Sequence, residues 1–433
     1  MSETRIPTEV ELAFEVMPCN ALRVAQEPGK APHPCAYFRS WGAYHSYDYE
    51  TAGPPPEPGI VHPAQYLGRA PLVPEMLSGC RKAPILAVGI NPNLPGWWPA
   101  TRGSLNPLFD DTKQFAHYFR YRATAKLELP KADYTAFGGG AADTPFSGFE
   151  LQVPVDAGGH RTVHLQLQNQ KMYLAYQGLL DDLAAAMGWA GAKLAVGEDL
   201  SYGNMVACPS AKWTTRADPD DPQLPPMTEA QRQGIVGECF NERKYFLRQL
   251  FQSLPTVLLV FSQNTANAFI GGLQGRFSAG NPKVGDPVAA LLDREVLLKY
   301  GDLPDGGVLD ARVIFAPHPT GNPADWQAAR PKVVAALAAA THAGRLLFRP
   351  ETGHLARPSG SCVFCTMLEI GPCDYLDEIK PLAVPPALAA EGLPGTAVDK
   401  PVQSALLAEF LESVHEAPEA WRASDDPPGV KES

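Results

Sequence analysis

Four short apolar runs, separated by longer helical patterns, restrict this chain to a narrow set of folds. The runs are PILAVGI (84–90), NMVAC (204–208), TVLLVFS (256–262) and RVIFA (312–316). A continuous apolar run of this length is typical of a strand buried on both faces of a parallel sheet. Between the runs, residues 170–189 and 228–254 repeat apolar side chains at helical spacing. We therefore predict an α/β fold, a three-layer α/β/α sandwich with a central, mainly parallel sheet.

The two ends of the chain lack this alternation and are rich in proline. We divide the chain into an irregular N-terminal extension (1–79), an α/β/α domain (80–345) and a C-terminal extension (346–433). The 44 prolines among 433 residues are about twice the average share, which favours irregular structure outside the core. The C-terminal extension carries three cysteines and one predicted helix (402–415).

Charge and hydropathy limit the partners and the compartment. The net charge of −11 argues against a protein that coats duplex nucleic acid, although it does not exclude a local basic groove. No apolar run reaches the roughly 18 residues that a membrane helix requires, and the N-terminus lacks the pattern of a signal peptide. We expect a cytoplasmic protein, in which thiols stay reduced unless a metal or a catalytic step uses them.

Two loops that follow the first and the last apolar run carry candidate functional residues. In VGINPNLPG, Gly89 and Pro92 form a tight turn that projects Asn91 from the end of the first run. In FAPHPTGNPADW, His318 lies between two prolines on a stiff loop. Alone, the first motif is more readily explained as a plain β-turn, and His318 is equally well explained as a capped structural histidine. Because the carboxyl ends of parallel strands open on one crevice, both loops together predict a site.

These motifs resemble those of a known enzyme superfamily. GINP after the first strand and HPTGNP after the last are similar to the two signature motifs of the uracil-DNA glycosylase superfamily. The Asn form of the first motif resembles the mismatch-specific and single-strand-selective branches. YGNMVACPSAKW, followed by a cysteine-bearing helix, resembles the iron–sulfur branch instead. The likeness covers about residues 80–345 and implies an enzyme that flips a base out of DNA and hydrolyses its N-glycosidic bond.

The resemblance implies roles for the two loops. Asn91 would hold the attacking water, on the turn made by Gly89 and Pro92. His318 would donate a hydrogen bond to the base oxygen on which negative charge develops. The rest of the second loop, with Pro319 and Asn322, would press into the minor groove and fill the space that the base leaves.

The resemblance also implies two contacts to the extruded base. Asn204 would pair with its Watson–Crick edge, whereas an asparagine that only bonds to neighbouring backbone is an equal alternative. Phe109 is our first choice for the aromatic ring that stacks on the base, with Phe115 and Tyr118 behind it. An Asn carboxamide flips to match either a uracil-like or a cytosine-like edge, so the sequence leaves the base open.

Cysteines in two parts of the chain predict a metal centre. Cys208 and Cys239 match two cluster ligands of the iron–sulfur branch, but the Cys-x-x-Cys that this branch has near its N-terminus is missing. SCVFCTMLEIGPC near the C-terminus supplies Cys362 and Cys365, with Cys373 as an alternative fourth ligand. We predict a structural 4Fe–4S cluster, with zinc as the alternative.

A basic run near the C-terminus offers candidate contacts to phosphate. Arg345, Arg349 and Arg357 would lie near the DNA, although a solvated face explains them as well. Neither loop motif holds a lysine for a Schiff base, so we expect a monofunctional DNA glycosylase, monomeric like its superfamily. The alternatives are a glycosylase for a modified base of foreign (phage) DNA, which would be a defence enzyme, and a non-catalytic nucleic-acid-binding iron–sulfur protein. The sequence shows no Gly-rich nucleotide motif that would support a redox protein.

Overall fold

The fold is described from a computed structural model of the chain. The residues it describes are 77–92, 119–121, 123–124, 149–154, 160–165, 171–207, 213, 228–304, 306–321, 323–358, 364–367 and 400–413. Several sequence predictions lie outside these residues: almost all of the 1–79 extension, the stacking candidates Phe109, Phe115 and Tyr118, the loop residue Asn322, and the cysteines Cys208, Cys362 and Cys373.

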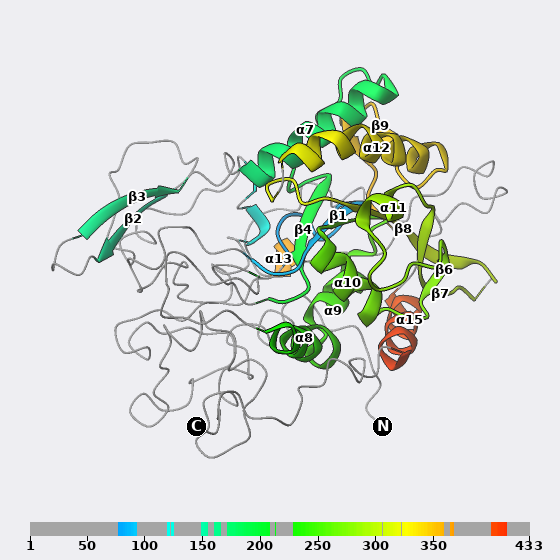
Figure 1. The fold of residues 1–433 in the computed structure, drawn as a ribbon. Helices are drawn as coiled ribbons and strands as arrows, with labels where there is room; N and C mark the ends of the chain where they lie inside the picture. Colours follow the sequence, from blue (N-terminus) through cyan, green and yellow to red (C-terminus); the bar gives the residue numbers. More distant parts are fainter. Residues whose placement is uncertain are drawn as a thin grey trace, which may run out of the picture.

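A six-stranded sheet forms the centre of the molecule (Figure 1). Its strands, in spatial order, are β4 (Leu200–Asn204), β1 (Ile85–Gly89), β5 (Val257–Phe261), β8 (Val308–Ala316), β7 (Val296–Asp302) and β6 (Phe277–Ala279). The first four strands are parallel to one another. Next to them, β7 pairs with β8 in the antiparallel direction, and β6 pairs with β7 in the same way. The predicted α/β fold with a mainly parallel sheet is therefore confirmed. A separate antiparallel pair is formed by β2 (Phe149–Pro154) and β3 (His160–Leu165).

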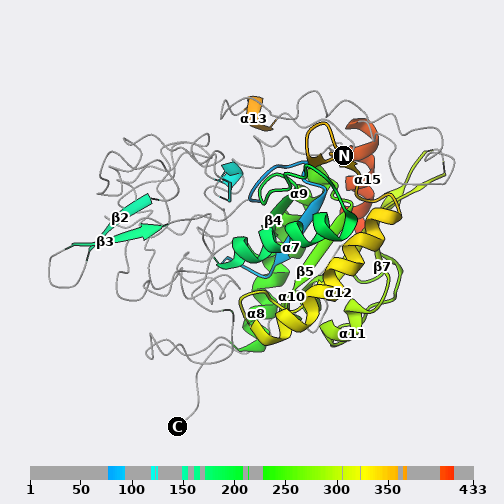
Figure 2. The same cartoon turned by 90° about the horizontal axis from the view of Figure 1, so that it is seen from above.

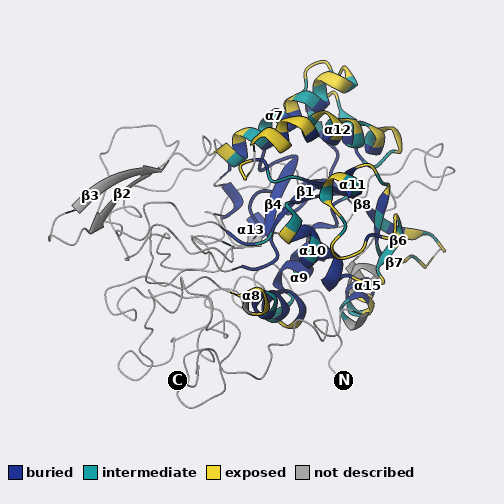
Figure 3. Ribbon diagram, viewed as in Figure 1, coloured by how far each residue is buried: buried dark blue, intermediate teal, exposed yellow. Residues whose placement is uncertain are grey.

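Helices cover both faces of this sheet (Figures 1 and 2). On one face, α7 (Lys171–Met187) and α12 (Pro323–His342) pack on alternate strand residues such as Leu259. On the other face, α9 (Tyr245–Ser253) and α10 (Gln263–Gly272) supply aromatic rings, and Phe269 meets Phe315 at 6.4 Å between ring centroids. Because successive strand residues point to opposite faces, the sheet buries apolar side chains against both helical layers. The strands are buried, whereas the outer sides of α7 and α12 are exposed (Figure 3).

The predicted second strand is wrong in position. β4 spans Leu200–Asn204, whereas the apolar run 204–208 begins only at its last residue. Beyond β4, Met205 and Val206 donate backbone hydrogen bonds to Gly89 and Ile90 and follow the turn that leaves β1. The strand was missed because it includes serine, tyrosine and glycine and is therefore no continuous apolar run, although all five of its residues are buried.

The predicted helix 228–254 is interrupted. It consists of α8 (Glu229–Val236), a π-helical segment η5 (Gly237–Arg243) and α9, with Lys244 in the left-handed conformation (φ 59°) between the last two. π-helical turns are rare in proteins overall, and those that do occur are often found at functional sites. Helical periodicity does not reveal them, because the apolar spacing continues through the break.

The described parts of the C-terminal extension pack on the core. The predicted helix 402–415 is confirmed as α15 (Lys400–Ser413), where Phe410 lies 4.8 Å from the Phe251 ring of α9. The remaining elements are α11 (Val288–Leu292), β9 (Phe348–Arg349), β10 (His354–Leu355) and α13 (Phe364–Met367). None of the helices in the described ranges has the length and apolar character needed to cross a membrane.

Candidate functional site

The order of the parallel strands marks one edge of the sheet as the candidate site. From β1 the sheet extends to β4 on one side and to β5 and β8 on the other, so the direction of winding reverses beside β1. In open α/β sheets, ligands bind at the carboxyl ends of the strands next to such a reversal. Asn91 follows β1, Asn204 ends β4 and His318 follows β8. The structure therefore brings the three predicted residues to the carboxyl ends of the parallel strands, which we call the carboxyl edge. At ordinary strand spacing, β1 and β8 are about 10 Å apart.

The turn after β1 is packed too closely for any residue but glycine at its start. A Cβ atom at Gly89 would lie 2.5 Å from the Tyr202 hydroxyl and 2.7 Å from Asn204 Oδ1. Asn91 is 8% exposed, and its Nδ2 donates a hydrogen bond to the carbonyl of Pro92 at 2.9 Å. The turn thus holds the Asn91 carboxamide in one orientation at the strand end.

His318 is oriented by its own loop. Its Nδ1 accepts a hydrogen bond from the backbone N–H of Thr320 at 3.2 Å, and the Gly321 N–H closes a turn onto the His318 carbonyl. Pro319, between them, is buried. Burial lowers the pKa of the imidazole below its ordinary value. A neutral imidazole that accepts at Nδ1 carries its proton on Nε2, so His318 offers an uncharged N–H donor.

Asn204 is positioned by a neighbour that the sequence analysis missed. The Tyr202 hydroxyl donates to Asn204 Oδ1 at 2.6 Å, and both side chains are buried. Residues two apart on a strand share a face, and this alternation is the signal from which the pair was predictable.

Ser262, at the carboxyl end of β5, is a second residue that the sequence analysis missed. Its φ of 83° and ψ of 154° lie in a region that glycine normally occupies. Its Oγ accepts from the Thr265 N–H at 3.2 Å and caps α10, and its own N–H donates to the Ala316 carbonyl. Backbone strain of this kind is concentrated at functional sites, and here it lies at the reversal in strand order.

One of the predicted metal ligands lies near the same edge. Cys239 is buried in the π-helical segment, where its Sγ accepts a hydrogen bond from the Ala207 N–H at 3.3 Å. Ala207 directly precedes Cys208 in the chain. Cys208 itself lies outside the described residues, so its pairing with Cys239 stays a prediction.

Cys365 interacts electrostatically with a cysteine that was not predicted. Burial raises the pKa of the Cys365 thiol, and Arg120 opposes this shift while a nearby Cys80 adds to it. The chain neighbours also touch, because the Arg81 guanidinium lies 4.2 Å from the centroid of the Phe364 ring. Cys80 precedes β1, a position that carries no recognisable ligand spacing.

Cys80 and Cys239 are attached to opposite ends of β4. Cys80 donates its N–H to the Gly197 carbonyl before this strand, whereas Cys239 contacts Ala207 after it. Five strand residues span about 15 Å. Within the described ranges, no group of three or more His, Cys, Asp or Glu side chains is placed to hold a metal ion. The four-cysteine set stays a prediction.

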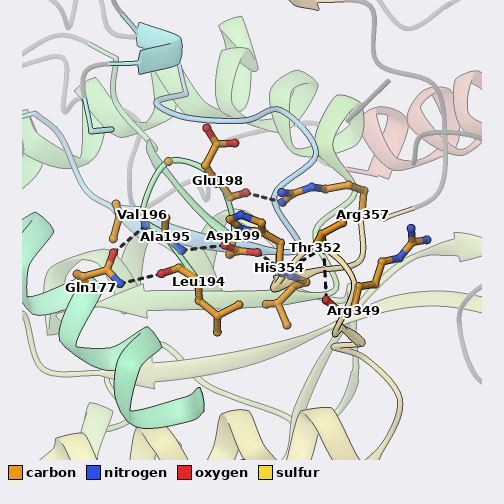
Figure 4. A network of polar contacts seen from close by, with 12 residues as sticks. Gln177, Leu194, Ala195, Val196, Glu198, Asp199, Arg349, Thr352, His354 and Arg357 are labelled. Carbon is orange, nitrogen blue, oxygen red and sulfur yellow. Dashed lines mark hydrogen bonds and ion pairs between the residues drawn. The ribbon is translucent and has the colours of Figure 1, made fainter. Parts of the chain in front are cut away.

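A buried polar network closes the amino end of the sheet (Figure 4). Arg120 forms an ion pair with Glu198 at 3.1 Å, and Arg357 donates to the Glu198 carbonyl at 2.5 Å. Asp199, which is fully buried, accepts hydrogen bonds from the Leu355 N–H at 2.7 Å and from His354 Nδ1 at 2.8 Å. The network therefore ties the segment after α12 to the start of β4.

This network bears on the basic run near the C-terminus. Arg357 is 2% exposed, and Arg345 forms an ion pair with Asp310 at 2.6 Å. These two arginines therefore bind the protein itself. Arg349 is only partly buried, and its proposed phosphate contact stays a prediction.

Comparison with models of known protein families finds no match for this chain, and comparison with curated proteins finds none either. The functional interpretation therefore depends on the geometry of the residues at the carboxyl edge.

Proposed function

We propose that the chain is a monofunctional DNA glycosylase of the uracil-DNA glycosylase type, built on that superfamily's three-layer α/β/α sandwich. It would extrude a damaged or modified base, most simply uracil, and hydrolyse its N-glycosidic bond. The observation that carries the proposal is the uncharged donor of His318, held at the same sheet edge as the carboxamides of Asn91 and Asn204.

His318 supports the departure of the base. As the bond between C1′ and the base nitrogen breaks, its electron pair moves to the base, and negative charge develops on the carbonyl oxygens. A neutral Nε2–H donor stabilises this charge without transferring a proton. Removal of one such donor typically slows a reaction about 10²–10³-fold.

Asn91 supports the attack of water. A carboxamide is a poor base, so its contribution is to position the water against the cationic sugar. The water oxygen forms the new bond to C1′, and its proton is released to solvent. No lysine from either loop motif is available for a covalent imine, so the DNA strand stays intact until alkali cleaves the abasic site.

A structural 4Fe–4S cluster, with zinc as the alternative, belongs to the same proposal. Cys208 and Cys239 would supply two thiolates, with Cys362 and either Cys365 or Cys373 supplying the others. Iron and acid-labile sulfide, measured on anaerobically purified protein, test this ligand set independently of activity. Cys239→Ser should lower both. Cys19→Ser, at an N-terminal cysteine outside the predicted ligand set, should lower neither.

The observed neighbours of Cys365 add one variant to that experiment. If Cys80→Ser lowers the iron content as far as Cys239→Ser does, Cys80 belongs to the ligand set. If only Cys80→Ser and Cys365→Ser lower the iron content, the pairing of Cys208 with Cys239 is overturned.

The identity of the base is tested with labelled oligonucleotides that carry uracil, hypoxanthine, 5-hydroxymethylcytosine or no lesion, followed by alkali. Breaks at uracil that the Asn91→Ala/His318→Ala variant does not produce support the proposal. Breaks only at hydroxymethylcytosine would favour a defence enzyme against phage DNA. Binding without any break would favour the non-catalytic alternative.

A further inference from the structure

The N-terminal extension joins the core beside the carboxyl edge. Cys80 donates its N–H to the Gly197 carbonyl, which lies before β4 begins. Ser78 forms an antiparallel bridge with Tyr202, with backbone hydrogen bonds of 2.7 and 2.9 Å in the two directions. Followed backward from Cys80, the chain therefore runs along β4 toward its last residue, Asn204. The rest of the extension is thus attached to the core next to the candidate site.

One stretch of this extension is unusually rich in aromatic residues. Six of the thirteen residues 37–49, which we call the aromatic stretch, are aromatic, against 9% of the whole chain. They are Tyr37, Phe38, Trp41, Tyr44, Tyr47 and Tyr49. The stretch lies outside the described residues, and its sequence contains no Leu, Ile or Val, the side chains that dominate the core of the sheet. This composition favours a surface that stacks on a ligand over a core segment.

Aromatic side chains bind single-stranded nucleic acid by stacking on its bases. Every base has a flat face, so stacking tolerates any sequence, and the loss of one stacked ring typically weakens binding about fivefold or more. Stacking also suits a chain with a net charge of −11, because it does not require a large basic surface. Arg345 and Arg357, which bind the protein itself, do not supply such a surface.

We propose that the aromatic stretch binds single-stranded DNA by base stacking and holds it at the carboxyl edge. This inference rests on the proposed function, because it takes DNA as the ligand of that edge. Residues 50–76 connect the stretch to the described core, and a chain of this length spans up to about 90 Å when extended. A strand held by the stretch can therefore reach Asn91 and His318. The protein should accordingly prefer single-stranded to duplex DNA.

The test is binding to labelled oligothymidine, which contains no uracil, as a single strand and as a duplex with oligodeoxyadenosine. In the leucine variant, Tyr44→Leu/Tyr47→Leu, apolar side chains that cannot stack replace two rings, and single-strand affinity should fall at least about tenfold. Tyr44→Phe/Tyr47→Phe keeps both rings and should change this affinity less than about twofold. Tyr66→Leu is the matched control, because it makes the same substitution in the extension outside the aromatic stretch. It should bind like the wild type.

Duplex binding separates stacking from general damage to the protein. Paired bases stay stacked within the duplex, so the leucine variant should bind the duplex as the wild type does. Unchanged single-strand binding, or equal losses on the single strand and the duplex, would overturn the inference.

Cross-linking gives a second readout that needs no variant. The wild type is irradiated with ultraviolet light in the presence of oligothymidine, and the cross-linked peptides are mapped. Cross-links within residues 37–49 would support the inference, whereas cross-links confined to residues 80–345 would contradict it.

The outcomes also separate this inference from the proposed function. If the wild type releases uracil and the leucine variant binds single strands as well as the wild type, the role of the aromatic stretch alone is overturned. If the leucine variant loses single-strand binding and the wild type releases no base, the role of the stretch is supported and the glycosylase is overturned.

Discussion

The two ends of the parallel strands hold polar side chains of opposite kinds. At the amino end, Glu198 and Arg120 are charged, are no more than 5% exposed and form an ion pair, and Asp199 is fully buried. At the carboxyl edge, Asn91 and His318 are neutral and are held by short contacts within their own turns. Buried charge that joins distant segments favours a unique packing, whereas oriented neutral donors are suited to a ligand. The comparison favours a stabilising role for the amino end, and it supports the proposal that the carboxyl edge carries the chemistry.

The largest effect on stability is expected at the amino end. Glu198→Ala leaves the Arg120 guanidinium buried without its carboxylate, and removal of one partner of a buried pair typically costs about 3–5 kcal/mol. Urea unfolding measures the loss. Asp293→Ala, which removes an exposed pair with Lys332, is the control and should cost less than about 1 kcal/mol. Equal losses in the two variants would remove the distinction between the ends.

At the carboxyl edge, relief of backbone strain should raise the free energy of unfolding instead of lowering it. Ser262→Gly relieves an unfavourable backbone conformation worth about 1–3 kcal/mol and loses a helix cap worth a few tenths when glycine replaces it. We expect the free energy of unfolding to rise by about 1 kcal/mol. Ser278→Gly, in the exposed strand β6, should lower it by about 0.5–1 kcal/mol. A loss of stability in both variants would show that the edge stores no strain.

The smallest effect concerns pH. Burial lowers the pKa of folded His318 below its ordinary value of 6.5, so the unfolded chain takes up a proton near that pH that the folded chain does not. The contribution of His318 to stability is therefore complete above pH 6.5 and is lost as the pH falls toward the lower folded pKa. Unfolding midpoints measured across this range should fall less steeply for His318→Ala than for the wild type. Identical slopes would mean that the histidine is already solvated in the folded protein.

The sequence predicted what depends on local pattern. The runs 84–90, 256–262 and 312–316 are strands because continuous apolar residues suit a sheet covered on both sides. The same logic missed β4, because Ser201 and Gly203 interrupt the apolar pattern although both are buried. The strands β7 and β6 were also missed, because an antiparallel edge follows a different, half-buried pattern.

The candidate site was predictable only where a residue lies next to a strand end. Asn91 and His318 follow strands directly, so strand order alone brought them to one edge. The contacts of Tyr202 with Asn204 and the strain at Ser262 depend on how several strands and helices pack. The proximity of Cys80 to Cys365 joins segments far apart in the chain, and neither spacing nor periodicity encodes it.

The most direct test of the account is the single-turnover release of free uracil from a uracil-containing strand, measured per folded molecule. We predict release by the wild type, a rate lowered at least about 10²–10³-fold by Asn91→Ala/His318→Ala, and an unchanged rate for Glu198→Ala. No release from folded, iron-loaded wild type, or equal losses in both variants, would contradict the assignment of chemistry to the carboxyl edge.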